Sequence, residues 1–151
     1  MNALRHAFFL VALFALPAFA APVLDVYKGP RCGCCSDWVT YMEEQGFETK
    51  STEMAPQEVF PTKKKARIPE GKESCHTAFI GGYSIEGHVP AEDVKRLLKE
   101  KPDAVGLTVP GMPVGSPGME MGDRKDPYEV LLINNDGSTE VFSRHNYPPA
   151  K

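Results

Sequence analysis

The reactive side chains of this sequence are concentrated in two short motifs. Cys32-Gly33-Cys34-Cys35 contains three of the four cysteines, and the fourth, Cys75, is followed directly by His76. Cys32 and Cys35 form a C-x-x-C pair, whose spacing at the start of a helix permits a reversible disulfide and lowers a thiol pKa. We expect the fold to bring the two motifs together into a soft-metal or redox centre.

The third sulfur of the first motif favours metal binding, because simple dithiol exchange does not need it. Crowded thiolates repel one another unless protons or a cation neutralise them, and Cu(I), which accepts two or three bridging thiolates, relieves that repulsion. Two alternatives stay open. One is thiol redox chemistry at Cys32 and Cys35 without a metal. The other is a structural zinc site built from Cys32, Cys34 or Cys35, Cys75 and His76.

The residues after His76 predict where the second motif lies. Residues 78–87 resemble the glutaredoxin pattern of an apolar strand, a tight turn at Gly81-Gly82 and a returning strand. In that family a Val-Pro pair with a cis proline precedes the strand and faces the redox cysteines. Here Cys75 and His76 stand at those two positions, so the resemblance implies that two potential ligands replace a peptide-docking loop. Without this match, Cys75 is interpreted as a small buried hydrophobic residue.

Weaker candidate ligands are spread along the chain. Thioether sulfur also suits Cu(I), and it is offered by Met54, Met112, Met119 and Met121. Met119 and Met121 have the M-x-M spacing of methionine-rich copper loops, although packing of an irregular loop explains these methionines equally well. His88 and His145 are predicted to be surface or hydrogen-bonded residues rather than ligands.

Periodicity and turn residues predict the elements that position these motifs. In chain order they are a strand at 24–27, the cysteine loop, a helix from Ser36 to Gln45, a strand at 47–54, a short helix or irregular connection at 56–66, a hairpin of strands at 75–80 and 83–87, and a helix that begins at Pro90 and ends before Pro102. This is the element order of a thioredoxin-like α/β domain. A Pro/Gly/Met-rich loop without regular structure at 107–122 and a C-terminal hairpin at 128–133 and 140–143 are expected to follow.

The N-terminal segment predicts export. Residues 1–20 have the pattern of a signal peptide, in which Arg5 precedes an apolar run and Ala-Phe-Ala at 18–20 forms a cleavage site. Cleavage after Ala20 would leave one thioredoxin-like metal-binding domain, residues 21–151, with no membrane association. An uncleaved N-terminal anchor is the alternative.

The charge pattern does not indicate a nucleic-acid partner. The formal net charge is −3 and no basic patch dominates. Lys63-Lys64-Lys65-Ala66-Arg67 is a local basic run, and it is predicted to be a solvated helix face. We therefore expect no binding of nucleic acid.

Several separated motifs together resemble one known family. V-Y-K-x-P-x-C-G-C-C-x-D-W, S-C-H-T-A, G-G-Y-x-I-E-G-H-V-P, V-P-G-M-P-x-G-S-P-G-M-E and D-P-Y occur in that order at 26–38, 74–78, 81–90, 109–120 and 126–128. They resemble the CopG-type family of bacterial copper-resistance proteins, an exported thioredoxin-like family long catalogued as of unknown function. The resemblance implies a periplasmic protein that binds copper at its C-x-C-C site. By this resemblance, Cys32, Cys34, Cys35 and Cys75 match the family's thiols. His76 and the methionines of the 112–121 loop lie in the family's motifs, but the resemblance implies a ligand role for them less strongly.

These observations lead to a functional hypothesis with two alternatives. The hypothesis is a periplasmic copper-binding protein in copper resistance or homeostasis, which holds Cu(I) in a polynuclear thiolate cluster. One alternative is a thiol-disulfide oxidoreductase that uses Cys32 and Cys35, including a version in which these thiols change the oxidation state of copper. The other is a chaperone that transfers copper to another periplasmic copper-handling protein.

Overall fold

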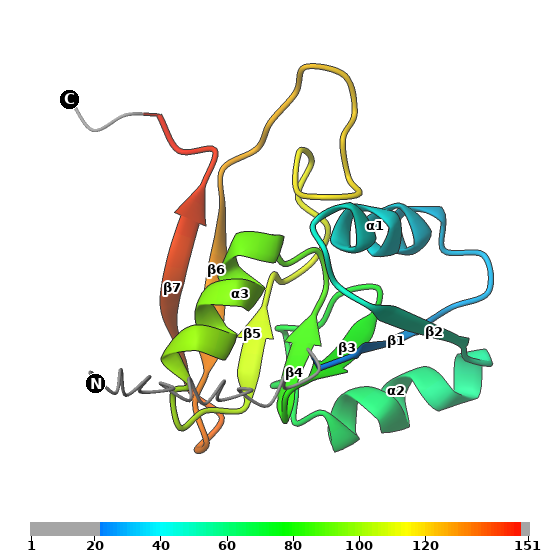
Figure 1. Ribbon diagram of the computed structural model, residues 1–151, viewed down its shortest axis with the longest axis vertical. Coiled ribbons are helices and arrows are strands. Elements are labelled where there is room, and N and C mark those ends of the chain that lie inside the picture. The colour runs from blue at the N-terminus through cyan, green and yellow to red at the C-terminus, as the bar shows by residue number, and fades with distance from the viewer. Residues whose placement is uncertain (1–21, 149–151) are drawn as a thin grey trace, which may run out of the picture.

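The computed structural model describes residues 22–148, which form a seven-stranded mixed sheet and three helices (Figure 1). The strand order across the sheet is β2-β1-β3-β4-β5-β6-β7. The elements in chain order are β1 (Leu24–Lys28), α1 (Gly33–Glu44), β2 (Thr49–Glu53), α2 (Pro56–Lys65), β3 (Thr77–Ile80), β4 (Tyr83–Glu86), α3 (Ala91–Glu100), β5 (Gly106–Thr108), β6 (Tyr128–Ile133) and β7 (Thr139–His145). The predicted α/β class is confirmed, and the elements follow the predicted order with one further strand, β5.

The centre of the sheet brings β1 and β3 together. β1 and β2 are parallel and joined through α1, whereas β1 and β3 are antiparallel. β3 and β4 form the predicted hairpin across Gly81-Gly82, where both glycines have positive φ. Because β1 and β3 run in opposite directions, the end of β1 and the start of β3 lie at the same edge of the sheet.

The helices cover both faces of the sheet. α1 and α3 pack their apolar side chains, including Trp38 and Leu97, on the face that carries Val26, Ala78 and Ile85. α2 lies on the opposite side of the sheet from α1 (Figure 1). Successive side chains of a strand point to opposite faces of the sheet, so one set of side chains faces each helix layer and is buried against it.

Among the differences from the predicted elements, two concern the starts of elements beside the cysteines and one is an additional strand. α1 begins at Gly33 rather than Ser36, so Cys34 and Cys35 belong to its first turn. β3 begins at Thr77, and Cys75 and His76 lie in the segment before it. β5 occupies Gly106–Thr108, within a stretch expected to lack regular structure, because it pairs with β4 and β6, partners that local sequence does not reveal.

One surface prediction was wrong. Lys63 was expected on a solvated helix face, but its side chain is buried and its ammonium contacts Glu86 and Thr77 on the sheet. The local basic run says nothing about a carboxylate that lies 23 residues later in the chain. A buried charge requires such a partner.

Within residues 22–148, the helices are all too short or too polar to cross a membrane. The predicted signal peptide at residues 1–20 lies outside the described residues. The boundaries of the domain predicted at 21–151 also lie outside the described residues.

Gly106 is predicted to be essential for the β4–β5 pairing. A Cβ at this position would overlap the Ser84 backbone of the neighbouring strand, and φ is +153°. Gly106→Ala should therefore lower the free energy of unfolding by about 3 kcal/mol or more. Urea denaturation of the purified variant measures this loss.

Gly82→Ala is the matched control for that variant. Gly82 also has a positive φ, +89°, but no atom lies within 4 Å of a Cβ placed there. Only the backbone strain applies, so the expected loss is about 1–2 kcal/mol. Equal losses in the two variants would contradict the steric argument at Gly106.

Candidate metal centre

The C-x-C-C motif forms the entrance to α1. Cys32 is the N-cap residue with an extended backbone (φ −86°, ψ 92°), and Cys34 and Cys35 occupy the first turn. Cys35 is fully buried, while Cys32 and Cys34 are partly exposed. Unpaired backbone N–H groups and the positive end of the helix dipole are therefore next to the sulfurs.

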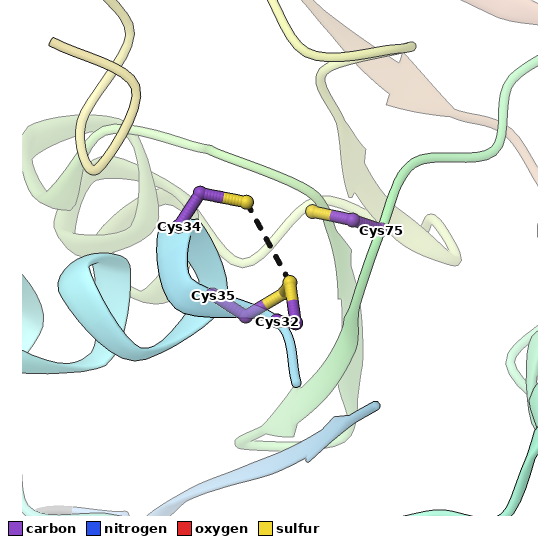
Figure 2. Close-up of side chains that lie close together, drawn as sticks. All are labelled: Cys32, Cys34, Cys35 and Cys75. Atoms are coloured by element: carbon purple, nitrogen blue, oxygen red, sulfur yellow. Dashed lines mark hydrogen bonds between the residues drawn. A yellow bond between two sulfur atoms is a disulfide. The ribbon is translucent and has the colours of Figure 1, made fainter. Parts of the chain in front are cut away.

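A disulfide joins Cys32 and Cys35, whose Cα atoms are 5.3 Å apart. Cys34 and Cys75 are free thiols, and the Sγ of Cys34 lies 3.5 Å from that of Cys32. Figure 2 shows the Cys75 side chain pointing at this group from the segment before β3. The four sulfurs all lie within 4.8 Å of one another, so the fold places both cysteine motifs in one site.

His76 lies behind Cys75 and is fully buried. Its Nδ1 is 3.4 Å from the Cys75 sulfur, and its ring packs against the Trp38 indole at a centroid distance of 4.4 Å. The His76 Nε2 atom has no hydrogen-bond partner among the described residues. The ring thus directs one nitrogen toward the thiol and leaves its other nitrogen buried without a hydrogen-bond partner among the described residues.

His88 is a site residue that the sequence prediction missed. It was expected to be a surface or hydrogen-bonded residue rather than a ligand, yet it is fully buried with its Nε2 3.1 Å from the Cys75 sulfur. Its Nδ1 lies 2.8 Å from the Pro117 carbonyl. Since a carbonyl only accepts hydrogen bonds, Nδ1 carries the proton and the Nε2 lone pair faces Cys75.

The hairpin register contains a signal that identifies His88. Thr77 pairs with Glu86, and the same antiparallel count places residue 88 opposite residue 75. Counting outward from the Gly81-Gly82 turn would therefore have placed His88 beside Cys75. His145, by contrast, binds Asp93 at 2.7 Å, in agreement with its predicted role as a hydrogen-bonded residue.

Cys75 belongs to two overlapping groups of potential ligands. One consists of the four cysteines, and the other consists of Cys75, His76 and His88, whose ligand atoms also lie within 4.8 Å of one another. An all-sulfur set and a sulfur-nitrogen set therefore share one thiol. Thiolate and imidazole together suit Cu(I) and Zn²⁺ better than hard oxygen-seeking cations.

Burial determines the protonation of this second group. It raises the pKa of the Cys75 thiol to about 11, with the nearby Cys34 adding to the effect. Burial lowers the pKa of His76 well below its ordinary value, assisted by His88 and Lys63, and it also lowers the pKa of His88. At neutral pH both imidazoles are neutral and able to bind a metal, while Cys75 must lose a proton to do so.

The loop between β5 and β6, yellow to orange in Figure 1, passes beside α1. Gly118 lies so close to the helix that a Cβ there would be 2.8 Å from the Cys34 carbonyl oxygen. Met119 is half-buried in this loop, whereas Met112 and Met121 are 53% and 64% exposed. Met54 is buried and accepts a hydrogen bond from Thr62. Ligand roles for Met119 and Met121 stay predictions.

Comparison with known proteins places this geometry in a family. The chain is 43% identical to a solved structure titled "Copper resistance protein copG- Form 1", with a TM-score of 0.77, over 85% of this chain and 99% of that one. A second structure, "Copper resistance protein copG- Form 2", is 41% identical with the same TM-score and covers 85% and 100% of the two chains. The chain belongs to the CopG family. The resemblance inferred from its motifs is thereby confirmed.

Of two further comparisons, one matches part of this CopG-family chain and the other matches nothing. A family model described as "Protein of unknown function, DUF411" matches residues 72–119. That stretch includes Cys75, His76 and His88, but not the C-x-C-C motif. No protein of curated function matches the chain.

The buried thiol leads to a prediction about pH. In Cys34→Ser with the Cys32–Cys35 disulfide closed, Cys75 is the one free thiol of the chain. Burial, the largest cause of the raised pKa, remains in this variant, so the apparent pKa should stay above the ordinary 9.0. The rate of alkylation by iodoacetamide, measured from pH 7 to 11, reports it.

The raised pKa of Cys75 also predicts how metal binding at this residue depends on pH. A metal ion that binds Cys75 needs its thiolate, so such binding would release a proton and tighten as pH rises toward that raised pKa. An alkylation pKa at or below 9.0 would contradict the burial argument. Free cysteine, alkylated in parallel, is the control for reagent reactivity.

Proposed function

We propose that this protein binds Cu(I) in the periplasm and contributes to copper resistance. The observation that carries the proposal is the convergence of four cysteine sulfurs within 4.8 Å, three from the α1 entrance and one from the segment before β3. The copper-resistance title of two structures more than 40% identical to this chain supports the same role.

The donor set fits copper cargo. In the reduced protein, Cys32, Cys34, Cys35 and Cys75 supply four sulfurs, which are soft ligands that select Cu(I). Sulfurs this close can bridge ions, and Cys75 also borders His76 and His88. We infer that the reduced site holds more than one Cu(I), with the thiolates bridging and the histidines beside Cys75 completing the set.

The cellular setting is part of the proposal. Residues 1–20 act as a signal peptide and residues 21–151 form the exported domain, as the N-terminal pattern predicts. A Cys32–Cys35 disulfide is compatible with an oxidising compartment such as the periplasm. Storage would keep Cu(I) from damaging other proteins, and delivery to another periplasmic copper-handling protein is the chaperone version of the same binding.

Metal stoichiometry tests the binding proposal. The reduced domain should bind two or more Cu(I) per chain, measured anaerobically by competition with a chelator and by elemental analysis. Cys34→Ser should lower the stoichiometry, and its affinity loss should exceed the roughly 10–100-fold cost typical of changes outside the ligand shell.

Ser36→Ala is the matched control, because Ser36 is exposed in the same helical turn and its hydroxyl binds the Cys32 carbonyl rather than a sulfur. It should bind copper as the parent does. A Cys34→Ser variant with full stoichiometry would contradict the role of the third sulfur. Binding of a single Zn²⁺ in preference to Cu(I) would favour a structural zinc site.

A second candidate function follows from the disulfide. Cys32 and Cys35 as thiols can each give up one electron and one proton, so that one S–S bond forms while two Cu(II) become two Cu(I). Cys34 and Cys75 are then still free thiols beside the disulfide. The pair would act as the electron source for copper, and an external reductant would have to restore it.

Mixing the reduced protein with Cu(II) under anaerobic conditions tests this chemistry. The expected result is two Cu(I) formed per Cys32–Cys35 disulfide. Loss of the Cu(II) electron paramagnetic resonance signal measures the reduction of copper, and peptide mapping detects the disulfide. Cys34→Ser keeps both electron-donating thiols, so it should still reduce copper while retaining it poorly. Cu(II) that persists beside a reduced Cys32–Cys35 pair would exclude this function.

A further inference from the structure

A buried carboxylate lies directly beneath the Cys75-His76 segment. Glu86, at the end of β4, is fully buried, and its Oε1 atom accepts a hydrogen bond from the Ser74 N–H at 2.6 Å. Its Oε2 atom accepts one from the Thr77 hydroxyl at 2.7 Å. One side chain therefore binds the residues on both sides of the Cys75-His76 pair.

The counter-ion comes from the opposite layer of the fold. Lys63 of α2 forms a salt bridge with Glu86 Oε1, and its Nζ atom also lies 3.2 Å from the Thr77 hydroxyl. Both charged side chains are nearly inaccessible to solvent, at 8% for Lys63 and 0% for Glu86. Three donors thus converge on one carboxylate: an ammonium, a hydroxyl and a backbone N–H.

Fold stability alone does not explain this ion pair. Burying two charges costs desolvation, and apolar residues of similar size often replace a buried pair without loss of stability. What apolar residues cannot supply is an acceptor for the Ser74 N–H and the Thr77 hydroxyl. The particular contribution of Glu86 is therefore to the position of residues 74–77.

Other contacts hold the segment only in part. The Gly87 N–H donates to the His76 carbonyl at 3.0 Å, and the Ser74 hydroxyl donates to the Gly111 carbonyl. These bonds hold one backbone carbonyl and one side chain of the segment. The Ser74 N–H next to Cys75 and the Thr77 hydroxyl next to His76 are held by the carboxylate.

We infer that Glu86 is a positioning residue for metal binding, which acts through Cys75 with Lys63 as its counter-ion. This inference rests on the proposed function, since it assumes that Cys75 is a copper ligand. By binding Ser74 and Thr77, the carboxylate holds the Cys75 sulfur against the three sulfurs at the entrance to α1. The α2 helix thereby contributes to the site through Lys63, although it supplies no metal ligand.

Two variants separate positioning from stability. Glu86→Gln keeps the side-chain size and one accepting oxygen. The NH₂ group that replaces the other oxygen cannot accept a hydrogen bond from the Thr77 hydroxyl, and Lys63 loses its counter-ion. Lys63→Met combined with Glu86→Leu removes both charges, so it should lose less stability than Glu86→Gln, and its remaining loss comes from the Ser74 N–H and the Thr77 hydroxyl left without an acceptor. Both variants should bind Cu(I) about 10–100-fold more weakly, as typical for residues that orient ligands.

The decisive experiment is a double-mutant cycle on the reduced exported domain. Cu(I) affinity is measured by chelator competition for the parent, Glu86→Gln, Cys75→Ser and the double variant. Because Glu86 acts through Cys75, the affinity loss from Glu86→Gln should disappear in the Cys75→Ser background. If Glu86→Gln does not fold, the Lys63→Met/Glu86→Leu protein takes its place in the same cycle.

Asp93→Asn is the matched control. The Asp93 side chain is also buried, and it pairs with His145 rather than with a residue of the metal centre. Its variant should lower the melting temperature while Cu(I) affinity stays within about twofold of the parent, as expected for independent sites.

Each outcome of the cycle has a distinct meaning. Unchanged affinity in Glu86→Gln, or an equal loss with and without Cys75, would overturn the positioning role and leave the proposed copper site intact. Unchanged affinity in Cys75→Ser would instead remove Cys75 from the proposed ligand set, and the inference would fail with it. Loss of the Glu86 effect only in the Cys75→Ser background supports the inference.

Discussion

The antiparallel pairing of β1 with β3 is the constraint on which the site depends. β1 leads directly into the C-x-C-C motif, and β3 starts directly after Cys75-His76. Opposite strand directions put these two ends at one edge of the sheet, although 39 residues lie between the two motifs in the chain. A parallel pairing of the same strands would have put the two cysteine motifs at opposite edges. The four-sulfur group thus follows from backbone hydrogen bonds between strands.

The site combines groups with different protonation demands. Cys32 and Cys35 can leave the ligand set as a disulfide, whereas Cys34 and Cys75 stay free beside it. Cys75 lies in a buried environment that opposes its thiolate, and the same environment keeps the adjacent histidines neutral. A monovalent cation that replaces the thiol proton satisfies both demands, because it neutralises the sulfur and accepts the imidazole lone pairs. Copper chemistry and thiol redox chemistry are therefore alternatives available to one group of atoms.

Polar contacts beneath and above the sulfurs restrict how the site can move. The Trp38 indole N–H donates to the Val89 carbonyl at 2.9 Å, which ties α1 to the segment after His88. The Pro117 carbonyl fixes the His88 ring, and the Lys63–Glu86 pair fixes the segment before β3. Apolar residues could replace the charge of the Lys63–Glu86 pair, but they could not accept the hydrogen bonds that Ser74 and Thr77 donate to Glu86.

Local signals in the sequence determined most of the fold. The C-x-C-C motif before a helix, the Gly81-Gly82 turn, the helix after Pro90 and the C-terminal hairpin all depend on neighbouring residues, and each is present in the structure. The thiols that converge were also evident, because cysteine spacing and the motifs of the family are properties of the chain alone.

Only the tertiary structure decided the features that depend on distant partners. The Lys63 ammonium is buried because Glu86 lies across the sheet, and β5 exists because β4 and β6 pair with it. His88 joins the site through the register of the β3–β4 hairpin, and Cys75 and His76 lie outside β3 while Glu86 binds the residues on either side of them. The physical reason is the same in each case: burial, strand pairing and buried-charge compensation are interactions between segments, whereas propensity and turn chemistry act within one.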